Sequence, residues 1–120
     1  MSNLRAFWLI LVVAACGGDD TISPPPPPPP SGNPPLTATV SLVAGNAFSP
    51  AAVTIARTGT VTWSNDAGVT HNVTFAQVTG APNNVANFST GSAARTFATA
   101  GTFAYTCTLH AGMAGQVTVQ

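Results

Sequence analysis

The alternation of apolar and polar residues between positions 37 and 120 predicts short β-strands. Seven segments are rich in Val, Thr and aromatic residues, and clusters of Gly, Asn, Asp and Pro separate them. These segments are residues 37–43, 53–56, 60–65, 69–75, 95–99, 101–107 and 116–120. Residues 76–89 are the least regular and predict a long loop. No stretch repeats apolar residues with a helical period, so the pattern favours an all-β fold, an antiparallel Greek-key β-sandwich.

Strand parity then assigns two candidate ligands to the core. Cys107 shares one face of its strand with Phe103 and Tyr105, so its side chain should point inward. His71 shares a face with Val73, which places it at the core end of its own strand. A buried, inert cysteine is the simplest interpretation of Cys107 taken alone, but its neighbours in the sequence argue against it.

The segment after Cys107 carries two further donors, in the spacing Cys-x2-His-x2-Met. His110 and Met113 should lie in a turn at one pole of the sandwich, because Cys107 ends its strand and Gly112 interrupts the next segment. Two imidazoles and a thiolate in a trigonal set, with a long axial thioether, suit a copper ion that cycles between Cu(I) and Cu(II). The predicted ligands of one copper ion are therefore His71, Cys107, His110 and Met113.

Other metals and chemistries fit these residues less well. Zinc accepts a Cys/His2 set, but a thioether is a poor fourth zinc ligand. A two-copper site would need a second cysteine in the turn. Hydrolytic or further metal chemistry would need a free histidine, and the sequence has only two. These residue counts predict a protein that is not an enzyme.

The first sixteen residues predict export. Residues 1–15 carry Arg5 and then an apolar run too short to span a bilayer, which is typical of a signal peptide. Val13-Ala14-Ala15-Cys16 resembles a bacterial lipobox, which implies cleavage before Cys16 and acylation of that cysteine. An ordinary secretory signal that leaves Cys16 unmodified is the alternative. We expect a membrane-anchored lipoprotein, periplasmic or at the cell surface, whose only membrane contact is the lipid on Cys16.

Residues 16–36 form a proline-rich segment that contains seven consecutive prolines at 24–30. Proline fixes φ and lacks a backbone donor, so this segment should adopt extended polyproline II and act as a spacer. At ~3.1 Å per residue the proline run spans roughly 20 Å. A ligand for aromatic recognition grooves is the alternative. The remaining residues, 37–120, are enough for one small domain.

Charge is scarce in this predicted domain, which carries only Arg57, Arg95 and Asp66. Nucleic-acid binding depends on neutralising several phosphates, so we expect no nucleic-acid partner. We expect the domain to be a monomer.

The domain resembles the cupredoxins, in particular the plastocyanin/amicyanin group. The matching segments are Phe48-Ser49-Pro50, Val53-Thr54-Ile55, Gly59-x-Val61-x-Trp63-x-Asn65, Thr70-His71-Asn72-Val73, Phe88-Ser89-Thr90-Gly91, Gly101-x-Phe103-x-Tyr105-x-Cys107 and Gly115-x-Val117-x-Val119. The Cys-to-Met spacing is the short one, nearer to amicyanin, and Leu109 stands where the family usually has proline.

This resemblance implies a blue (type 1) copper protein that transfers one electron between redox partners. It implies that Asn72 offers its backbone N–H to the sulfur of Cys107, a contact that tunes the potential. It also implies that His110 faces solvent and passes electrons, with partners docking near His110 and Leu109. A copper storage or delivery protein on the same fold is the alternative. A metal-free adhesion module is a third interpretation, which the intact ligand set disfavours.

Overall fold

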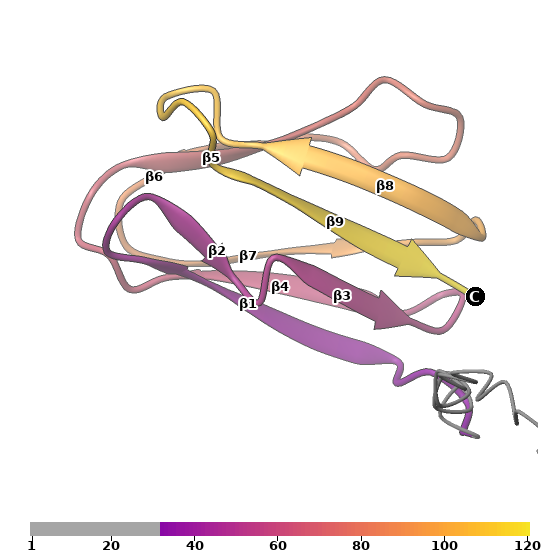
Figure 1. Cartoon of the computed structure of the whole chain (residues 1–120). Helices are drawn as coiled ribbons and strands as arrows, with labels where there is room; N and C mark the ends of the chain where they lie inside the picture. The colour runs from indigo at the N-terminus through magenta and orange to yellow at the C-terminus, as the bar shows by residue number, and fades with distance from the viewer. Residues whose placement is uncertain (1–31) are drawn as a thin grey trace, which may run out of the picture. The chain divides into compact units, whose positions relative to one another are not determined.

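The computed structural model describes residues 32–120, which form two β-sheets stacked face to face (Figure 1). The predicted signal peptide, Cys16 and the linker up to residue 31 lie outside the described residues. The described strands are β1 (Thr37–Val43), β2 (Ala47–Ser49), β3 (Ala52–Ile55), β4 (Thr60–Asn65), β5 (His71–Phe75), β6 (Val85–Phe88), β7 (Gly91–Thr96), β8 (Gly101–Thr106) and β9 (Ala114–Val119). Between residues 32 and 120 no helix is present, and therefore none that could cross a membrane.

The two sheets have the strand orders β2-β1-β4-β7 and β3-β9-β8-β5-β6. This arrangement confirms the all-β sandwich, but the sheets are mixed rather than antiparallel throughout. β1 and β4 pair in parallel, and so do β3 and β9. The parallel pair β1–β4 arises because the chain visits the other sheet through β3 before it returns beside β1. All other pairs are antiparallel.

Two strands were not predicted, and a third was misplaced. The predicted loop at 76–89 contains β6, which pairs with β5 across a register shift. β2 has only three residues, which is too few to show an alternation of apolar and polar positions. The strand expected at 95–99 lies at Gly91–Thr96 instead and pairs with β4 over its whole length. Its first residues, Gly-Ser-Ala-Ala, are poor strand formers, so this pairing, and not local propensity, determines β7.

Aromatic side chains fill the space between the sheets. Trp63, which is fully buried, meets Tyr105 and Phe75 edge to face, with ring centroids 5.4 and 5.7 Å apart, the geometry that aromatic quadrupoles favour. Cys107 and Met113 belong to the same buried cluster. The candidate ligands are therefore anchored to the core of the sandwich rather than placed on a surface loop.

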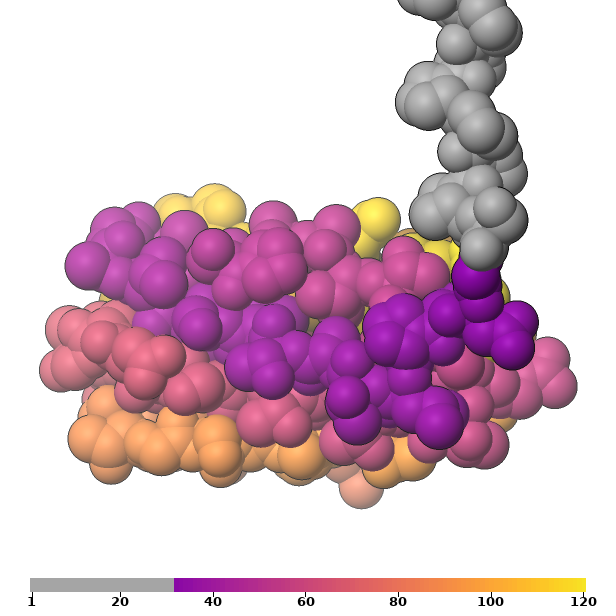
Figure 2. Space-filling view, turned by 90° about the horizontal axis from the view of Figure 1, so that it is seen from below, coloured from indigo at the N-terminus to yellow at the C-terminus, as the bar shows by residue number. Residues whose placement is uncertain are grey.

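Figure 2 looks onto the outer face of the sheet that contains β1, β4 and β7. The outward positions of these strands are mostly polar and uncharged. Hydroxyl side chains occupy most of the outward positions of the sheet, namely Thr37, Thr39 and Ser41 on β1, Ser49 on β2, Thr60, Thr62 and Ser64 on β4, and Ser92 and Thr96 on β7, while Val43, Ala47 and Ala94 are the apolar exceptions. The hydroxyls of Thr60 and Thr96 lie 3.1 Å apart and share a hydrogen bond. Hydroxyl groups thus cover this face, which explains how so weakly charged a domain presents a polar surface.

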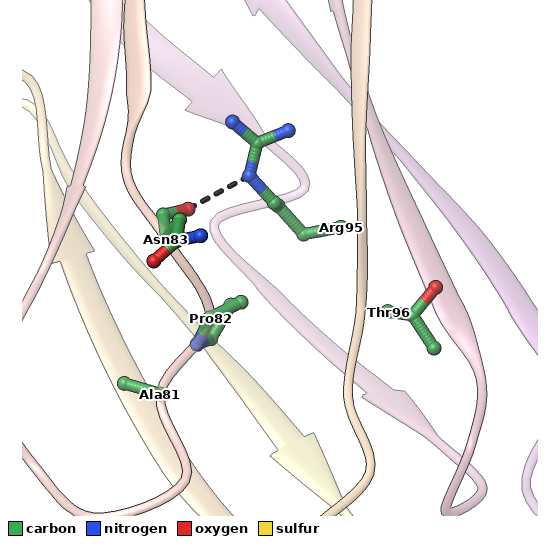
Figure 3. A pocket seen from close by; sticks show the side chains of 5 residues that line it. All are labelled: Ala81, Pro82, Asn83, Arg95 and Thr96. Carbon is green, nitrogen blue, oxygen red and sulfur yellow. Dashed lines mark hydrogen bonds between the residues drawn. The ribbon is translucent and has the colours of Figure 1, made fainter.

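One of the two domain arginines is used structurally. The guanidinium of Arg95 donates to the carbonyl of Asn83 at 2.7 Å (Figure 3). It also donates to the carbonyls of Asn84 and Ala94, each at 2.7 Å. These bonds tie β7 to the segment between β5 and β6. Because its donors point at backbone carbonyls, Arg95 serves this segment rather than the candidate metal site.

Candidate metal centre

The side chains of His71, Cys107 and His110 converge at one end of the sandwich. His71 opens β5, Cys107 directly follows β8, and His110 lies in the turn beyond it (Figure 1). β5 and β8 run antiparallel, so the start of β5 and the end of β8 lie at the same edge. This topology brings together residues that are 36 positions apart in the sequence.

The distances from the Cys107 sulfur to the two imidazoles are close to those that a bound metal requires. The sulfur of Cys107 lies 3.8 Å from Nδ1 of His71 and 3.5 Å from Nδ1 of His110. All three ligand atoms lie within 4.8 Å of one another. Metal bonds of about 2.0–2.3 Å in a trigonal plane would place such atoms roughly 3.6–3.8 Å apart. The donor set and its spacing therefore fit a copper ion.

The ligand turn is closed by its own backbone. The Cys107 N–H donates to the carbonyl of Met113 at 3.0 Å, and the Met113 N–H donates to that of His110 at 3.3 Å. Gly112 has a φ of 77°, a left-handed conformation that glycine adopts without strain. Met113 is only 1% exposed and belongs to the same buried cluster as Cys107, so its thioether would be the fourth donor available to a bound copper ion.

Burial divides the two imidazoles into an inner and an outer one. His71 is fully buried, whereas His110 is partly exposed. Burial, with a smaller contribution from the charge of His110, lowers the pKa of His71 below its ordinary value. His71 is therefore neutral at physiological pH, which is the form that binds a metal. The partly exposed His110 is the imidazole that solvent can approach.

The side chain of Asn72 connects β5 to the ligand turn. Its Oδ1 accepts from the Thr108 N–H at 3.0 Å, and its Nδ2 donates to Oγ1 of Thr108 at 2.7 Å and to Oδ1 of Asn87 at 3.0 Å. The sequence predicted a backbone contact between Asn72 and the Cys107 sulfur, and that contact stays a prediction. The hydrogen bonds between the side chain of Asn72 and Thr108 were not predicted. The signal for them in the sequence was a polar residue directly after each of two candidate ligands, Asn72 after His71 and Thr108 after Cys107.

An uncharged rim surrounds His110. Leu109 is 48% exposed, and Ala111, Gly112 and Ala114 are exposed as well. The charged residues described for this domain are Arg57, Asp66 and Arg95, and all three lie outside the turn. The edge of the site is therefore apolar and neutral.

Comparisons with known proteins agree with this geometry. Residues 39–120 match a model of copper-binding proteins of the plastocyanin/azurin family. A plastocyanin from Scenedesmus fuscus is 42% identical over 84 residues, which cover 61% of this chain and 86% of that protein.

Solved structures show the same architecture. A purple cupredoxin from Nitrosopumilus maritimus is similar with a TM-score of 0.63 at 31% identity, over 69% of this chain and 99% of the other. A mutant of amicyanin in its reduced Cu(I) form gives a TM-score of 0.63 at 32% identity, over 70% of this chain and 82% of the other.

Proposed function

The chain belongs to the plastocyanin/azurin family of copper-binding proteins, and we propose that its copper ion carries single electrons between redox partners. The observation that supports this proposal most directly is the convergence of two imidazole nitrogens and one thiolate within 4.8 Å. When bound, copper supplies a one-electron Cu(I)/Cu(II) couple.

The residues around the site suit rapid electron transfer. The turn that carries Cys107 and Met113 is closed by a backbone hydrogen bond and anchored in the core. Soft sulfur donors favour Cu(I), and imidazoles serve both oxidation states. A preorganised site whose ligands suit Cu(I) and Cu(II) about equally needs little rearrangement when an electron arrives or leaves. The partly exposed His110 offers the electron a short route to the surface.

We further propose that the protein is not an enzyme. Both histidines of the sequence belong to the metal centre, so no histidine is left for a second metal or for acid–base chemistry. A carrier needs only this one centre.

The proposal includes a membrane tether. Cys16, at the end of a lipobox-like segment, would carry the acyl chains, and the proline-rich residues 16–36 would space the domain from the bilayer. A single saturated chain binds membranes only weakly, so more than one acyl chain on Cys16 is expected. Mass spectrometry of the membrane fraction would detect the acylated Cys16.

A visible spectrum with a redox titration tests the proposed function. The copper(II)-loaded protein is expected to show an intense visible band from thiolate-to-copper charge transfer, and to lose and regain it reversibly with one electron per copper. Stoichiometric copper binding without this band would contradict a blue site. Transfer of Cu(I) to an acceptor faster than electron exchange would instead favour copper delivery.

Partner docking is proposed at the apolar rim around His110, formed by Leu109, Ala111, Gly112 and Ala114. The neutrality of this rim predicts weak electrostatic steering. Electron-transfer rates with a neutral partner should change less than about threefold between low and physiological salt, where the Debye length falls from roughly 30 Å to 8 Å.

Leu109→Asp should slow the same reaction much more than any change of salt. Val78→Asp is the matched control, because Val78 is also 48% exposed but lies beyond the far end of β5 from His71. Equal rates for the Leu109 variant and the wild type, or an equal loss in the Val78 variant, would place docking elsewhere on the domain. A steep salt dependence would do the same.

A further inference from the structure

Asn65 is a buried polar residue at the end of β4 whose side chain bonds to three separate positions. It is 6% exposed. Its Nδ2 donates to the carbonyl of Val69 at 2.9 Å and to that of Phe88 at 2.8 Å. Its Oδ1 accepts from the Ala67 N–H at 3.2 Å. One side chain therefore joins β4, the β4–β5 connection and the end of β6.

The two carbonyls that Asn65 holds belong to backbone positions close to His71. Val69 precedes His71 by two residues, and Phe88 is its cross-strand partner in the β5–β6 pair. The regular ladder is weak here. The β5–β6 register shifts directly after His71, and the β5–β8 pairing covers only Thr74 and Phe75 within β5. Asn65 thus adds side-chain hydrogen bonds to a stretch of backbone that strand pairing holds only at the His71–Phe88 pair.

The imidazole of His71 depends on this support. Its Nδ1 faces Cys107, and its Nε2 is buried without a hydrogen-bond partner among the described residues. A metal-binding histidine usually has its ring oriented by a hydrogen bond from its second nitrogen. In this domain no such hydrogen bond orients the ring, so its position depends on the backbone that carries it. Asn65 holds that backbone at Val69, two residues before His71, and at Phe88, opposite His71.

We propose that Asn65 is a positioning residue for His71. By holding the backbone around His71, Asn65 keeps the imidazole in the orientation that copper binding requires. The proposal rests on the proposed copper function, and it assigns to Asn65 a role in metal affinity beyond its contribution to stability. The three hydrogen bonds of the Asn65 side chain form a clamp, which is distinct from the contacts of Asn72. This clamp should exist before the metal binds, because all three bonds are made within the protein.

Two variants and one control test this role. Asn65→Ser removes the reach of the side chain, whereas Asn65→Asp keeps its size and the acceptor for Ala67 but loses both donors. The control is Val61→Ala, on the same strand and fully buried, which weakens the core without touching the clamp. Copper affinity by competition with a chelator and the visible band of each copper(II) protein are measured, together with thermal unfolding of the copper-free proteins.

Both Asn65 variants are expected to bind copper about 10- to 100-fold more weakly, the size of effect seen when a residue that orients a metal ligand is lost, with a shifted visible band. Val61→Ala should lower the unfolding temperature but keep the affinity and the band. Wild-type affinity in Asn65→Asp, or an equal loss in Val61→Ala, would overturn the proposal.

The wild-type protein gives an independent test that needs no variant. Both side-chain amide protons of Asn65 should exchange slowly with solvent in copper-free protein, because each is bonded to a backbone carbonyl and the side chain is only 6% exposed. Rapid exchange would show that no clamp exists before metal binding and would overturn the proposal. If the wild-type protein binds no copper, the proposed function is refuted. Slow exchange of the Asn65 amide protons in that protein would still show that the Asn65 hydrogen bonds exist, so the two failures can be told apart.

Discussion

Replacing Cys107 with serine is expected to abolish the visible absorption of the copper(II) protein. The band requires charge transfer from a thiolate to copper, and a serine hydroxyl has no equivalent donor orbital. The Cys107 sulfur is also central to the site, 3.5 and 3.8 Å from the two imidazoles. Copper affinity should fall as well, because a neutral hydroxyl replaces an anionic ligand. Absorption spectra and copper stoichiometry of both proteins measure the effect.

Tyr105→Phe is the control for this experiment. Tyr105 lies two residues before Cys107 on the same inward face, and its hydroxyl has no hydrogen-bond partner among the described residues. This variant should stay blue with full copper occupancy. A coloured serine variant would show that the chromophore does not depend on Cys107. An equal loss of colour in Tyr105→Phe would attribute the effect to general disturbance of the strand.

The fold was predictable where local pattern and tertiary structure agree. Segments 37–43 and 60–65 were predicted with the bounds of β1 and β4, because their β-branched and aromatic residues alternate cleanly. β6 and β7 were missed or misplaced because their sequences, Val-Ala-Asn-Phe and Gly-Ser-Ala-Ala-Arg-Thr, carry little strand signal. Their conformation comes from pairing with β5 and β4, which the sequence does not display.

The centre of the site was predictable because its chemistry is compact in the sequence. Cys107, His110 and Met113 lie within one turn, and strand parity directed His71 inward, so donor types alone indicated the metal. The supporting asparagines were not predictable in the same way. The contacts of Asn65 reach carbonyls up to 23 positions away and those of Asn72 reach 36. Such contacts depend on the strand order, which residue type and spacing do not reveal.

The role of Met113 is tested by the reduction potential of the bound copper in variants of this residue. Met113→Gln should keep bound copper but lower the potential, because an oxygen donor stabilises Cu(II) better than a thioether does. A tenfold to hundredfold shift in the preference for Cu(II) corresponds to about 60–120 mV for a one-electron couple. Protein-film voltammetry on the wild type and the variant measures this difference.

Met113→Leu is the matched control, because leucine fills a similar volume without a donor atom. Met113 is buried in the core cluster with Cys107, so leucine keeps the apolar packing there and removes only the donor atom. If the thioether is an axial ligand, its loss in Met113→Leu should raise the potential, since Cu(II) loses more than Cu(I) when a donor is removed. The two variants should therefore move in opposite directions from the wild type. Potentials that stay unchanged in both would mean that Met113 only packs against the site and that the copper is held by His71, Cys107 and His110 alone.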